Sequence, residues 1–505
     1  MLRSLIVAAR DRARLAEILG VVSRFGLHLL LKRIGLPVDE SDADDGDTTA
    51  DLPRRTRKAL EELGPTFVKF GQILATRGDL LSPPWIAELE KLHSRAVTIP
   101  FDTLRPAVEA ALGEAPESAF ARFDAEPIAA ASIAQVHRAR LHDGTEVAVK
   151  IRRPDIRAPM EADLRLLAQF AAMAEAASAE ARRYAPSALV RHLAEAVLGE
   201  LDFTHEGRNA DRLREDFSGN ARVVVPAIHW PWTSETLLVM DFIDGVPPRD
   251  GPGLIDRGID PHAIADLGAD MVLDMVLVNG RFHADPHPGN LLCLPGNRIA
   301  LLDLGMIGHV SPLRREEFID FVRSIAGSDA AGLATILRRW SVVDDIPAAA
   351  FGRAADRLIE RHGGSRIVLK AMIADFLGLM REERLVLPPD LVLIFKAMIT
   401  IDGVLSAIQP DYDLSAAIAR ASTRIALARL DPDRWGGTVR ELLWELSRAG
   451  DDAPRLLRTT LKRLGSEPES QIAADPSAAL AAAGSRIAVA LFLGLGLIAG
   501  ALLLG

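Results

Sequence analysis

Two acidic residues and one amide beside a predicted hairpin constrain this 505-residue chain more than any other feature. Asn290 follows Asp285 by five positions, and Asp303 comes eighteen residues after Asp285 and opens an Asp-Leu-Gly sequence. Apolar residues 299–302 precede Asp303, and Gly296-Asn297 supplies turn residues before them, so this stretch predicts a hairpin whose second strand ends at Asp303. The polar side chains are therefore expected at strand–loop junctions.

This spacing is typical of ATP-dependent phosphoryl transfer in the protein-kinase-like fold. There, a loop acid accepts the proton of the attacking hydroxyl, an amide of the same loop reaches one Mg²⁺ ion, and the acid of a D-x-G turn bridges the phosphates through metal. We therefore predict Asp285 as the acid–base residue and Asn290 and Asp303 as Mg²⁺ ligands. Asp285 and Asn290 could instead be ordinary turn formers, but Asp303 in register makes that interpretation less favoured.

A second interpretation of the same loop is a zinc or iron site at His283, Asp285 and His287. Alternate residues of an extended segment share a face, which would bring these three side chains together. The chain has a single cysteine and no further histidine cluster to complete a coordination shell, so this interpretation is disfavoured.

Bulk composition excludes several classes of function. A net charge of −10 and a pI near 5.7 argue against nucleic acid as the main partner. The aromatic content of 5% also disfavours base stacking. One cysteine permits no internal disulfide. The length suffices for one bilobal unit with extensions at both ends.

Both ends of the chain differ from its middle. Residues 1–36 interleave arginines with apolar residues and predict an amphipathic helix, which could lie on anionic lipid or pack on the protein itself. Residues 37–51 are an acidic linker. Residues 487–505 carry no charge and are long enough to cross a bilayer, after a linker at 466–486. We predict a tail anchor in a bacterial-type inner membrane, with the remainder in the cytoplasm.

Residues 126–243 predict the nucleotide-binding lobe. Strands are expected around 134–140 and 145–151, and Lys150 in Val-Ala-Val-Lys lies where kinases hold the α and β phosphates. An alanine-rich loop replaces the usual phosphate-cradling glycines and should hold nucleotide differently. A later buried strand runs into a hinge where adenine would meet the backbone. The remaining candidate nucleotide-binding residues are Ala129, Ala130, Ala131, Ser132, Ile133, Ala134, Gln135, Val136, His137, Asp241 and Ile243.

Residues 187–213 predict one helix carrying Glu200 and Glu206. Six residues on a continuous helix correspond to a rotation of about 240°, so the two carboxylates would need different partners. Lys150 can pair with one of them. The helical extension at 52–125 offers Lys69 as the second lysine.

Together these motifs resemble the UbiB/ABC1 (ADCK, AarF) family of atypical kinases, whose members are often called 2-polyprenylphenol 6-hydroxylases. The resemblance covers residues 60–310. It rests on Lys69-Phe70-Gly71-Gln72 for K-x-G-Q, residues 129–137 for the Ala-rich loop, Lys150, Glu200-Leu201-Asp202 for E-x-D, Glu206, residues 285–290 and Asp303-Leu304-Gly305.

The resemblance implies an α+β, bilobal protein-kinase-like fold with a helical N-terminal extension and a C-terminal transmembrane helix. It implies that the K-x-G-Q helix folds over the site, that Lys69 pairs with Glu200 and Lys150 with Glu206, and that Gln72 and Asp202 belong to the catalytic set. It also implies ATP and Mg²⁺ as cofactors and ATPase-type handling of a polyprenyl quinone precursor lipid at the membrane, in support of other quinone-biosynthesis enzymes.

Two features argue against other reactions. Only six residues separate Gly305 from the predicted helix at Pro312, and no A-P-E follows, so a peptide substrate is disfavoured. Direct hydroxylation is disfavoured because the sequence lacks a flavin fingerprint, haem ligand set or iron triad. Residues 244–465 are expected to form the helical C-lobe.

Two alternative functions stay open. Residues 283–290 also resemble the H-G-D-x-H-P-x-N loop of aminoglycoside and choline phosphotransferases, so a small-molecule or lipid phosphotransferase is one. The other is a nucleotide-gated scaffold in which the apolar stripes of residues 313–465 hold lipid, although such stripes are more often plain core.

Overall fold

The computed structural model describes residues 11–25, 51–75, 77, 81–92, 98–177, 182, 185–341, 346–363, 369–383, 387–410, 412, 417 and 420. The chain divides into a unit of Met1–Ala428 and a unit of Arg429–Gly505, and every described residue belongs to the first. The predicted tail anchor at 487–505, the linker at 466–486 and nearly all of the acidic linker lie outside the described residues.

Helix α1 (Arg12–Arg24) packs on the protein itself. Its apolar residues Ile18 and Val21 are buried against helices α3 and α8, and the Arg14 guanidinium donates to both oxygens of the Asp163 carboxylate, at 2.6 and 3.1 Å. A further bond from Arg14 to the carbonyl of Leu63 is 2.6 Å long. For this part of residues 1–36, packing on the protein is therefore the arrangement found.

The predicted extension is helical and supports the nucleotide lobe. Its helices are α3 (Leu52–Leu63), α4 (Pro65–Ala75), α5 (Pro83–Leu89), α6 (Phe101–Leu112) and α7 (Pro116–Ala119). Gly64 has a φ of +100°, which lets the chain turn directly from α3 into α4. Gly71 of α4 lies against Leu60 and Leu92, so any larger side chain there would collide with both. The glycine of K-x-G-Q thus permits close packing of this helix.

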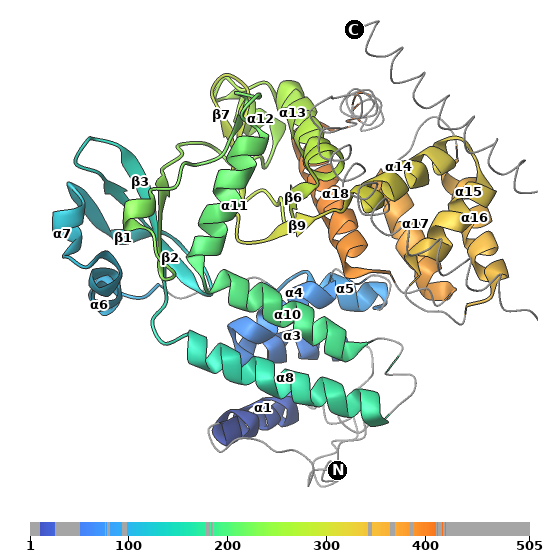
Figure 1. Cartoon of the computed structure of the whole chain (residues 1–505), viewed down its shortest axis with the longest axis horizontal. Coiled ribbons are helices and arrows are strands. Elements are labelled where there is room, and N and C mark those ends of the chain that lie inside the picture. Colours follow the sequence, from blue (N-terminus) through green and yellow to red (C-terminus); the bar gives the residue numbers. More distant parts are fainter. Residues whose placement is uncertain are drawn as a thin grey trace, which may run out of the picture. The chain divides into compact units, whose positions relative to one another are not determined.

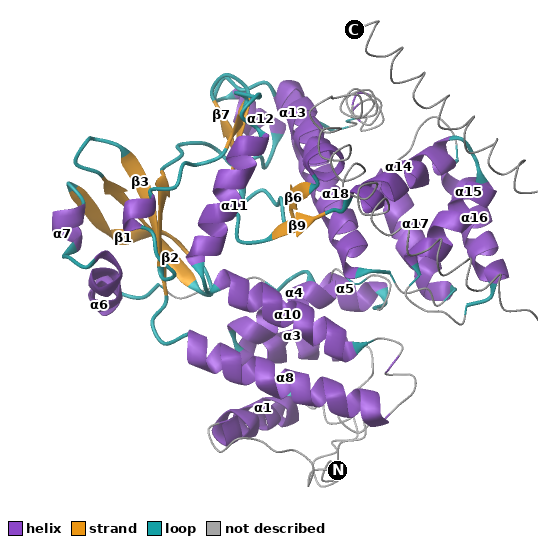
Figure 2. Ribbon diagram, viewed as in Figure 1, coloured by secondary structure: helices purple, strands orange, loops and turns teal. Residues whose placement is uncertain are grey.

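The nucleotide lobe is built on an antiparallel sheet in the order β1-β2-β3-β5 (Figures 1 and 2). The strands are β1 (Arg122–Ala130), β2 (Ala134–Arg140), β3 (Glu146–Arg152) and β5 (Leu237–Asp241). The predicted strands at 134–140 and 145–151 are confirmed. The register pairs Val136 with Lys150 and Lys150 with Leu238, which places all three on one face.

The prediction of a single helix over 187–213 was wrong. Helix α10 (Pro186–Glu200) ends just before Asp202, and α11 (Phe203–Asp216) begins there. The Asp202 carboxylate accepts from the backbone N–H of Thr204 at 2.9 Å and caps the second helix. Helix α8 (Arg157–Ala177) lies alongside α10 (Figure 1). The break changes the direction of the chain between Glu200 and Glu206, so the 240° estimate does not apply.

The second lobe combines short strands with helices. The predicted hairpin is present as β7 (Leu291–Leu294) and β8 (Arg298–Leu301), with β4 (Val223–Val224) parallel to β8. Strands β6 (Arg281–His283) and β9 (Ile307–His309) form a second pair. The turns and helices are η5 (Trp230–Trp232), α12 (Gly251–Ile255), α13 (Pro261–Leu273), the π-helical η6 (Asp274–Asn279), α14 (Pro312–Ala326), α15 (Ala330–Trp340), α16 (Ala348–His362), α17 (Leu369–Glu382) and α18 (Pro389–Ile408).

Aromatic side chains hold the last helices together. Phe321 of α14, Trp340 of α15, Phe376 of α17 and Phe395 of α18 are fully buried in mutual ring contact. Among the described residues, α18 is the helix long and apolar enough to cross a membrane, and 56% of its apolar window is buried inside the protein. A core helix satisfies the same test, and the buried residues of α18 belong to the same hydrophobic core as these aromatic side chains.

Two arginines of α1 provide a matched test of this packing. Asp163 is only 3% exposed, and Arg14→Met would leave its charge buried without a cation, so we expect a loss of about 3 kcal/mol in the free energy of unfolding. Arg24→Met removes a pair whose side chains are 62% and 43% exposed and should cost less than about 0.5 kcal/mol. Urea titration followed by circular dichroism measures both, and equal losses would contradict this account.

Candidate functional site

The site is organised around one ammonium between two carboxylates. Lys150 of β3 donates to both oxygens of Glu206, at 2.8 and 3.0 Å, and to Asp303 Oδ1 at 3.0 Å. Glu206 comes from the first turn of α11, and Asp303 follows β8. The Lys150 ammonium also lies 5.4 Å from the centre of the Phe203 ring. Three segments distant in the sequence thus meet at one charged group.

These charges shift one another's protonation. Burial lowers the pKa of Lys150, but Asp303 and Glu206 together outweigh it and raise that pKa above its ordinary value. The pKa of Asp303 is lowered, chiefly by Lys150. Burial raises the pKa of Glu206 despite its bond to Lys150, and the neighbouring charge of Asp303 adds to this. With two carboxylates facing one ammonium, the cluster favours an additional cation.

Asp303 has an unusual backbone conformation. Its φ is +51°, in the left-handed region that costs most L-residues about 1–2 kcal/mol. Hydrogen bonds on both sides hold it there: Leu302 N donates to Asn290 O at 2.8 Å, and Asn209 Nδ2 donates to Leu304 O at 3.0 Å. Leu304, which replaces the phenylalanine of D-F-G, is buried in the core. The Asp303 side chain is thereby directed to Lys150.

The loop after β6 is ordered by its own polar groups. The amide nitrogen of Asn290 donates to the carbonyl of Asp285 at 3.1 Å, so its amide oxygen is the atom suited to a metal. Both ring nitrogens of His283 bond to backbone: Nδ1 accepts from Asp285 N at 3.2 Å, and Nε2 lies 3.0 Å from Leu302 O. Burial lowers the pKa of His283, which favours the neutral ring. This histidine therefore positions the loop.

Asn290 and Asp303, two side chains suited to bind Mg²⁺, lie at neighbouring ends of the paired strands β7 and β8. The β7–β8 register places Asn290 beside Leu302 and hence next to Asp303. One carboxylate and one amide oxygen are a donor set that Mg²⁺ accepts when phosphates and water complete its shell. Within the described residues no cluster of three His, Cys, Asp or Glu side chains could hold a metal ion.

Helix α4 adds a second lysine–glutamate pair. Lys69 forms an ion pair with Glu200 at the end of α10. Burial lowers the pKa of Lys69, but Glu200, with smaller contributions from Asp303 and Asp285, raises it overall. Lys69 thus lies within electrostatic reach of both acids. The pairs Lys69–Glu200 and Lys150–Glu206 that the resemblance implied are both present.

Several predicted site residues have structural partners. Gln72 Nε2 donates to Leu92 O at 3.1 Å, Asp202 caps α11, and Asp241 accepts from the backbone N–H of Ala227 at 3.1 Å and lies 2.9 Å from His229 Nε2. Ile243 follows β5 and is half-buried. Their roles in nucleotide binding stay predictions.

For two residues of the Ala-rich segment, burial argues against direct nucleotide contact. Gln135 is fully buried and bonds through Nε2 to Ile99 O at 3.1 Å, and His137 is fully buried between Phe101 and Phe123. Strand alternation places both on the face of β2 opposite to Val136 and Lys150. Only residues 131–133 form the turn between β1 and β2, where Ile133 is buried; Ala129 and Ala130 end β1 and Ala134 begins β2.

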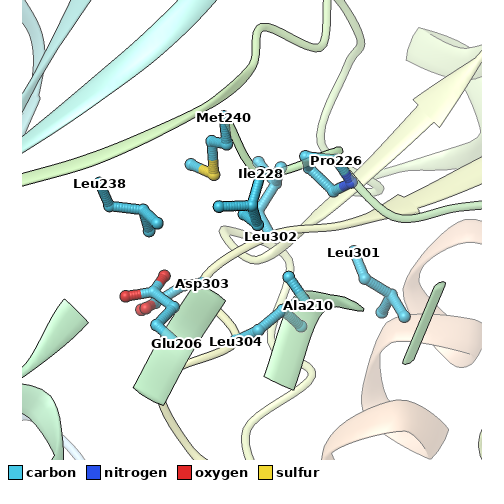
Figure 3. A pocket seen from close by; sticks show the side chains of 10 residues that line it. All are labelled: Glu206, Ala210, Pro226, Ile228, Leu238, Met240, Leu301, Leu302, Asp303 and Leu304. Carbon is cyan, nitrogen blue, oxygen red and sulfur yellow. The ribbon is translucent and has the colours of Figure 1, made fainter. Parts of the chain in front are cut away.

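An apolar recess adjoins the ion cluster. Figure 3 shows the carboxylates of Glu206 and Asp303 together at one side of it. The other lining residues are Ala210, Pro226, Ile228, Leu238, Met240, Leu301, Leu302 and Leu304. The recess leaves little free space beside the Lys150 ammonium, so its apolar side chains mainly pack around the ion cluster.

Lys396 was not among the predicted site residues. This residue of α18 forms an ion pair with Asp285, with 3.2 Å between Nζ and Oδ1. A signal was available, because Lys396 is the one basic residue in the apolar sequence of α18. An ammonium in such a helix requires a carboxylate partner from elsewhere in the fold.

A lysine–glutamate pair beneath a four-stranded sheet, an Asp-x4-Asn loop and a D-x-G aspartate define an atypical kinase-like protein. Comparisons with known proteins agree. Residues 91–337 match the ABC1 atypical kinase-like domain, and residues 359–413 match the UbiB helical domain. The chain belongs to the UbiB family of ABC1 atypical kinases.

Two bacterial proteins illustrate the similarity to curated relatives. The chain is 34% identical over 420 residues to a probable protein kinase UbiB of Xylella fastidiosa, covering 81% of this chain and 76% of that protein. It is 32% identical over 435 residues to a probable protein kinase UbiB of Pseudomonas aeruginosa, covering 84% and 80%. A complex of Rv3197 with erythromycin from Mycobacterium tuberculosis has a similar fold, with a TM-score of 0.50 and 22% identity over 73% of this chain and 96% of that one. Family membership implies a role in ubiquinone biosynthesis.

The ion cluster predicts that replacing Lys150 makes the free energy of unfolding depend on pH. Lys150→Met leaves Glu206 buried beside Asp303 without its cation, so the pKa of Glu206 should rise further above 4.5. The native state then binds more protons than the unfolded chain, and stability falls as the pH rises through this interval. We expect Lys150→Met to be less stable at pH 8 than at pH 5 by at least about 1.4 kcal/mol, measured by urea titration relative to Lys150→Met/Glu206→Gln. The same pH dependence in both variants would contradict the assignment.

Proposed function

We propose that this protein binds ATP with Mg²⁺ between its lobes and uses cleavage of the terminal phosphate to handle a polyprenyl-phenol precursor of ubiquinone at the membrane. The observation that carries the proposal is the contact of Lys150 with both Glu206 and Asp303. It brings the proposed phosphate-binding amine and the proposed metal-binding acid together, as an assembled kinase site requires. Family membership supports the connection to ubiquinone.

Each residue then has a task that its position supports. Asn290 and Asp303 hold Mg²⁺, which neutralises phosphate charge when bound. Lys150 contacts the α and β phosphates, and the backbone at the end of β5, at Asp241 and Ile243, receives the adenine. Asp285 accepts the proton of the attacking water or hydroxyl. The reaction is hydrolysis or phosphoryl transfer, depending on which acceptor reaches Asp285.

The segment after Asp303 favours a small or lipid acceptor over a polypeptide. Residues 306–311 alone separate Gly305 from α14, and half of them belong to β9. Protein kinases bind their peptide on a longer segment at this position. Lys69 and α4, which lie at the same site, further restrict access for a folded protein. The name protein kinase given to the curated relatives therefore describes the fold better than the acceptor we propose here.

Asp303→Asn tests the chemistry. Asparagine tolerates a left-handed backbone and keeps the shape of the side chain, but it lacks the charge that Mg²⁺ needs. We expect the ATPase rate to fall at least about a hundredfold, with an unchanged melting temperature and no restoration of quinone production in a deletion strain. Asp320→Asn, at an exposed acid of α14, is the control and should keep the full rate. Full activity and rescue by Asp303→Asn would refute catalysis and favour the nucleotide-gated scaffold.

Lipid coupling needs a separate measurement. The ATPase rate of the full chain is compared without membranes, with anionic vesicles, and with vesicles plus a phenol bearing a short alkyl chain. We expect the phenol to stimulate release of inorganic phosphate several-fold, because its hydroxyl resembles the polar end of the proposed lipid. A rate that neither addition changes would contradict lipid handling, and a phosphorylated phenol would instead establish a phosphotransferase.

A further inference from the structure

Helix α18 contributes one charged side chain, that of Lys396, to the candidate site. The Lys396 ammonium lies 3.2 Å from Asp285 Oδ1, and the side chains are 26% and 40% exposed. The flanking residues Phe395 and Ala397 are buried in the helical core. Lys396 therefore leaves an apolar helix at the point where that helix passes the catalytic loop.

We propose that Lys396 binds the terminal phosphate of ATP while holding Asp285, and so distinguishes ATP from ADP. The inference rests on the proposed function, because it assigns a further residue to the same nucleotide site. An acid that accepts a proton beside the terminal phosphate places two negative groups close together. A cation between them relieves the repulsion and is most effective as charge develops in the reaction.

The hydrogen-bonding capacity of the two lysines supports assigning the terminal phosphate to Lys396 and the other phosphates to Lys150. A lysine ammonium has three donors. Lys150 already makes three bonds, two to Glu206 and one to Asp303, so it reaches the α and β phosphates only by sharing donors with these carboxylates. Among the residues that the structure describes, Asp285 is the ion-pair partner of Lys396, which leaves donors of this ammonium for phosphate oxygens. Lys396 can therefore gain a phosphate without giving up Asp285.

A purely structural role for the pair fits the observations less well. Ion pairs exposed to this extent contribute at most about 1 kcal/mol to stability. Arg14–Asp163, which anchors α1, has the burial expected of a structural pair, with side chains 18% and 3% exposed. An apolar side chain at position 396 would serve a core helix at least as well. The placement of an ammonium here is better explained by a ligand that it contacts.

The test compares two nucleotides in one variant. Calorimetry on the full chain with Mg²⁺ measures binding of ADP and of an ATP analogue with an imido group between the β and γ phosphates. For Lys396→Met we expect the affinity for the analogue to fall about tenfold or more, as for loss of a charge-assisted hydrogen bond, and the affinity for ADP to change less than about twofold. Lys396→Arg should retain most of the preference, and Lys58→Met, at an exposed lysine of α3, should match the wild type.

The alternatives give different results. If Lys396 only anchors α18, Lys396→Met will lower the melting temperature and will either weaken the binding of both nucleotides equally or leave both affinities unchanged. Either result overturns the inference, while the proposed function stands. If the wild-type protein binds neither nucleotide, the proposed function fails and this inference with it. Selective loss of the analogue at an unchanged melting temperature supports the assignment.

Discussion

The contact of the Lys150 ammonium with Glu206 and Asp303 is the interaction on which the rest of the site depends. The three charged groups come from a sheet strand, a helix and a hairpin, so the contact forms only when those elements are all in place. Each group would be costly to bury alone, and their mutual attraction offsets that cost. The left-handed backbone of Asp303 is part of the same arrangement, because a local strain persists only where surrounding contacts maintain it.

Features determined by local pattern could be predicted from the sequence. The β7–β8 hairpin follows from Gly296-Asn297, where both residues have positive φ, and the start of α14 follows from Pro312 behind its Ser311 cap. The break between α10 and α11 could not be predicted from periodicity. Leu201 and Phe203 on either side of Asp202 are both buried, so the apolar pattern continues through the break. Only the capping preference of aspartate indicated it.

Only part of the candidate site could be predicted, because the positions of several of its residues depend on tertiary contacts. Strand alternation alone places Gln135 and His137 on the face opposite to Lys150, so this information was present in the sequence. Lys396 is different. Its distance from Asp285 depends on how α18 packs against α13 and β9, which no local pattern specifies. What the sequence does show is a lone lysine in an apolar helix, and such a residue is a reason to look for a carboxylate elsewhere.

For the function that we propose, the balance of charge around the site favours binding of nucleotide and metal together. Three lysines, Lys69, Lys150 and Lys396, face four carboxylates, Glu200, Glu206, Asp285 and Asp303, which leaves one net negative charge. Free ATP carries several negative charges and would be repelled, whereas Mg²⁺ removes much of that repulsion and uses oxygen ligands that the site supplies. Because each lysine already has a carboxylate partner, bound phosphates must share these ammonium groups with them. A bound nucleotide would thereby couple the two lobes and α4 to its charge state, which is the property that the proposed ATP-driven handling of another molecule requires.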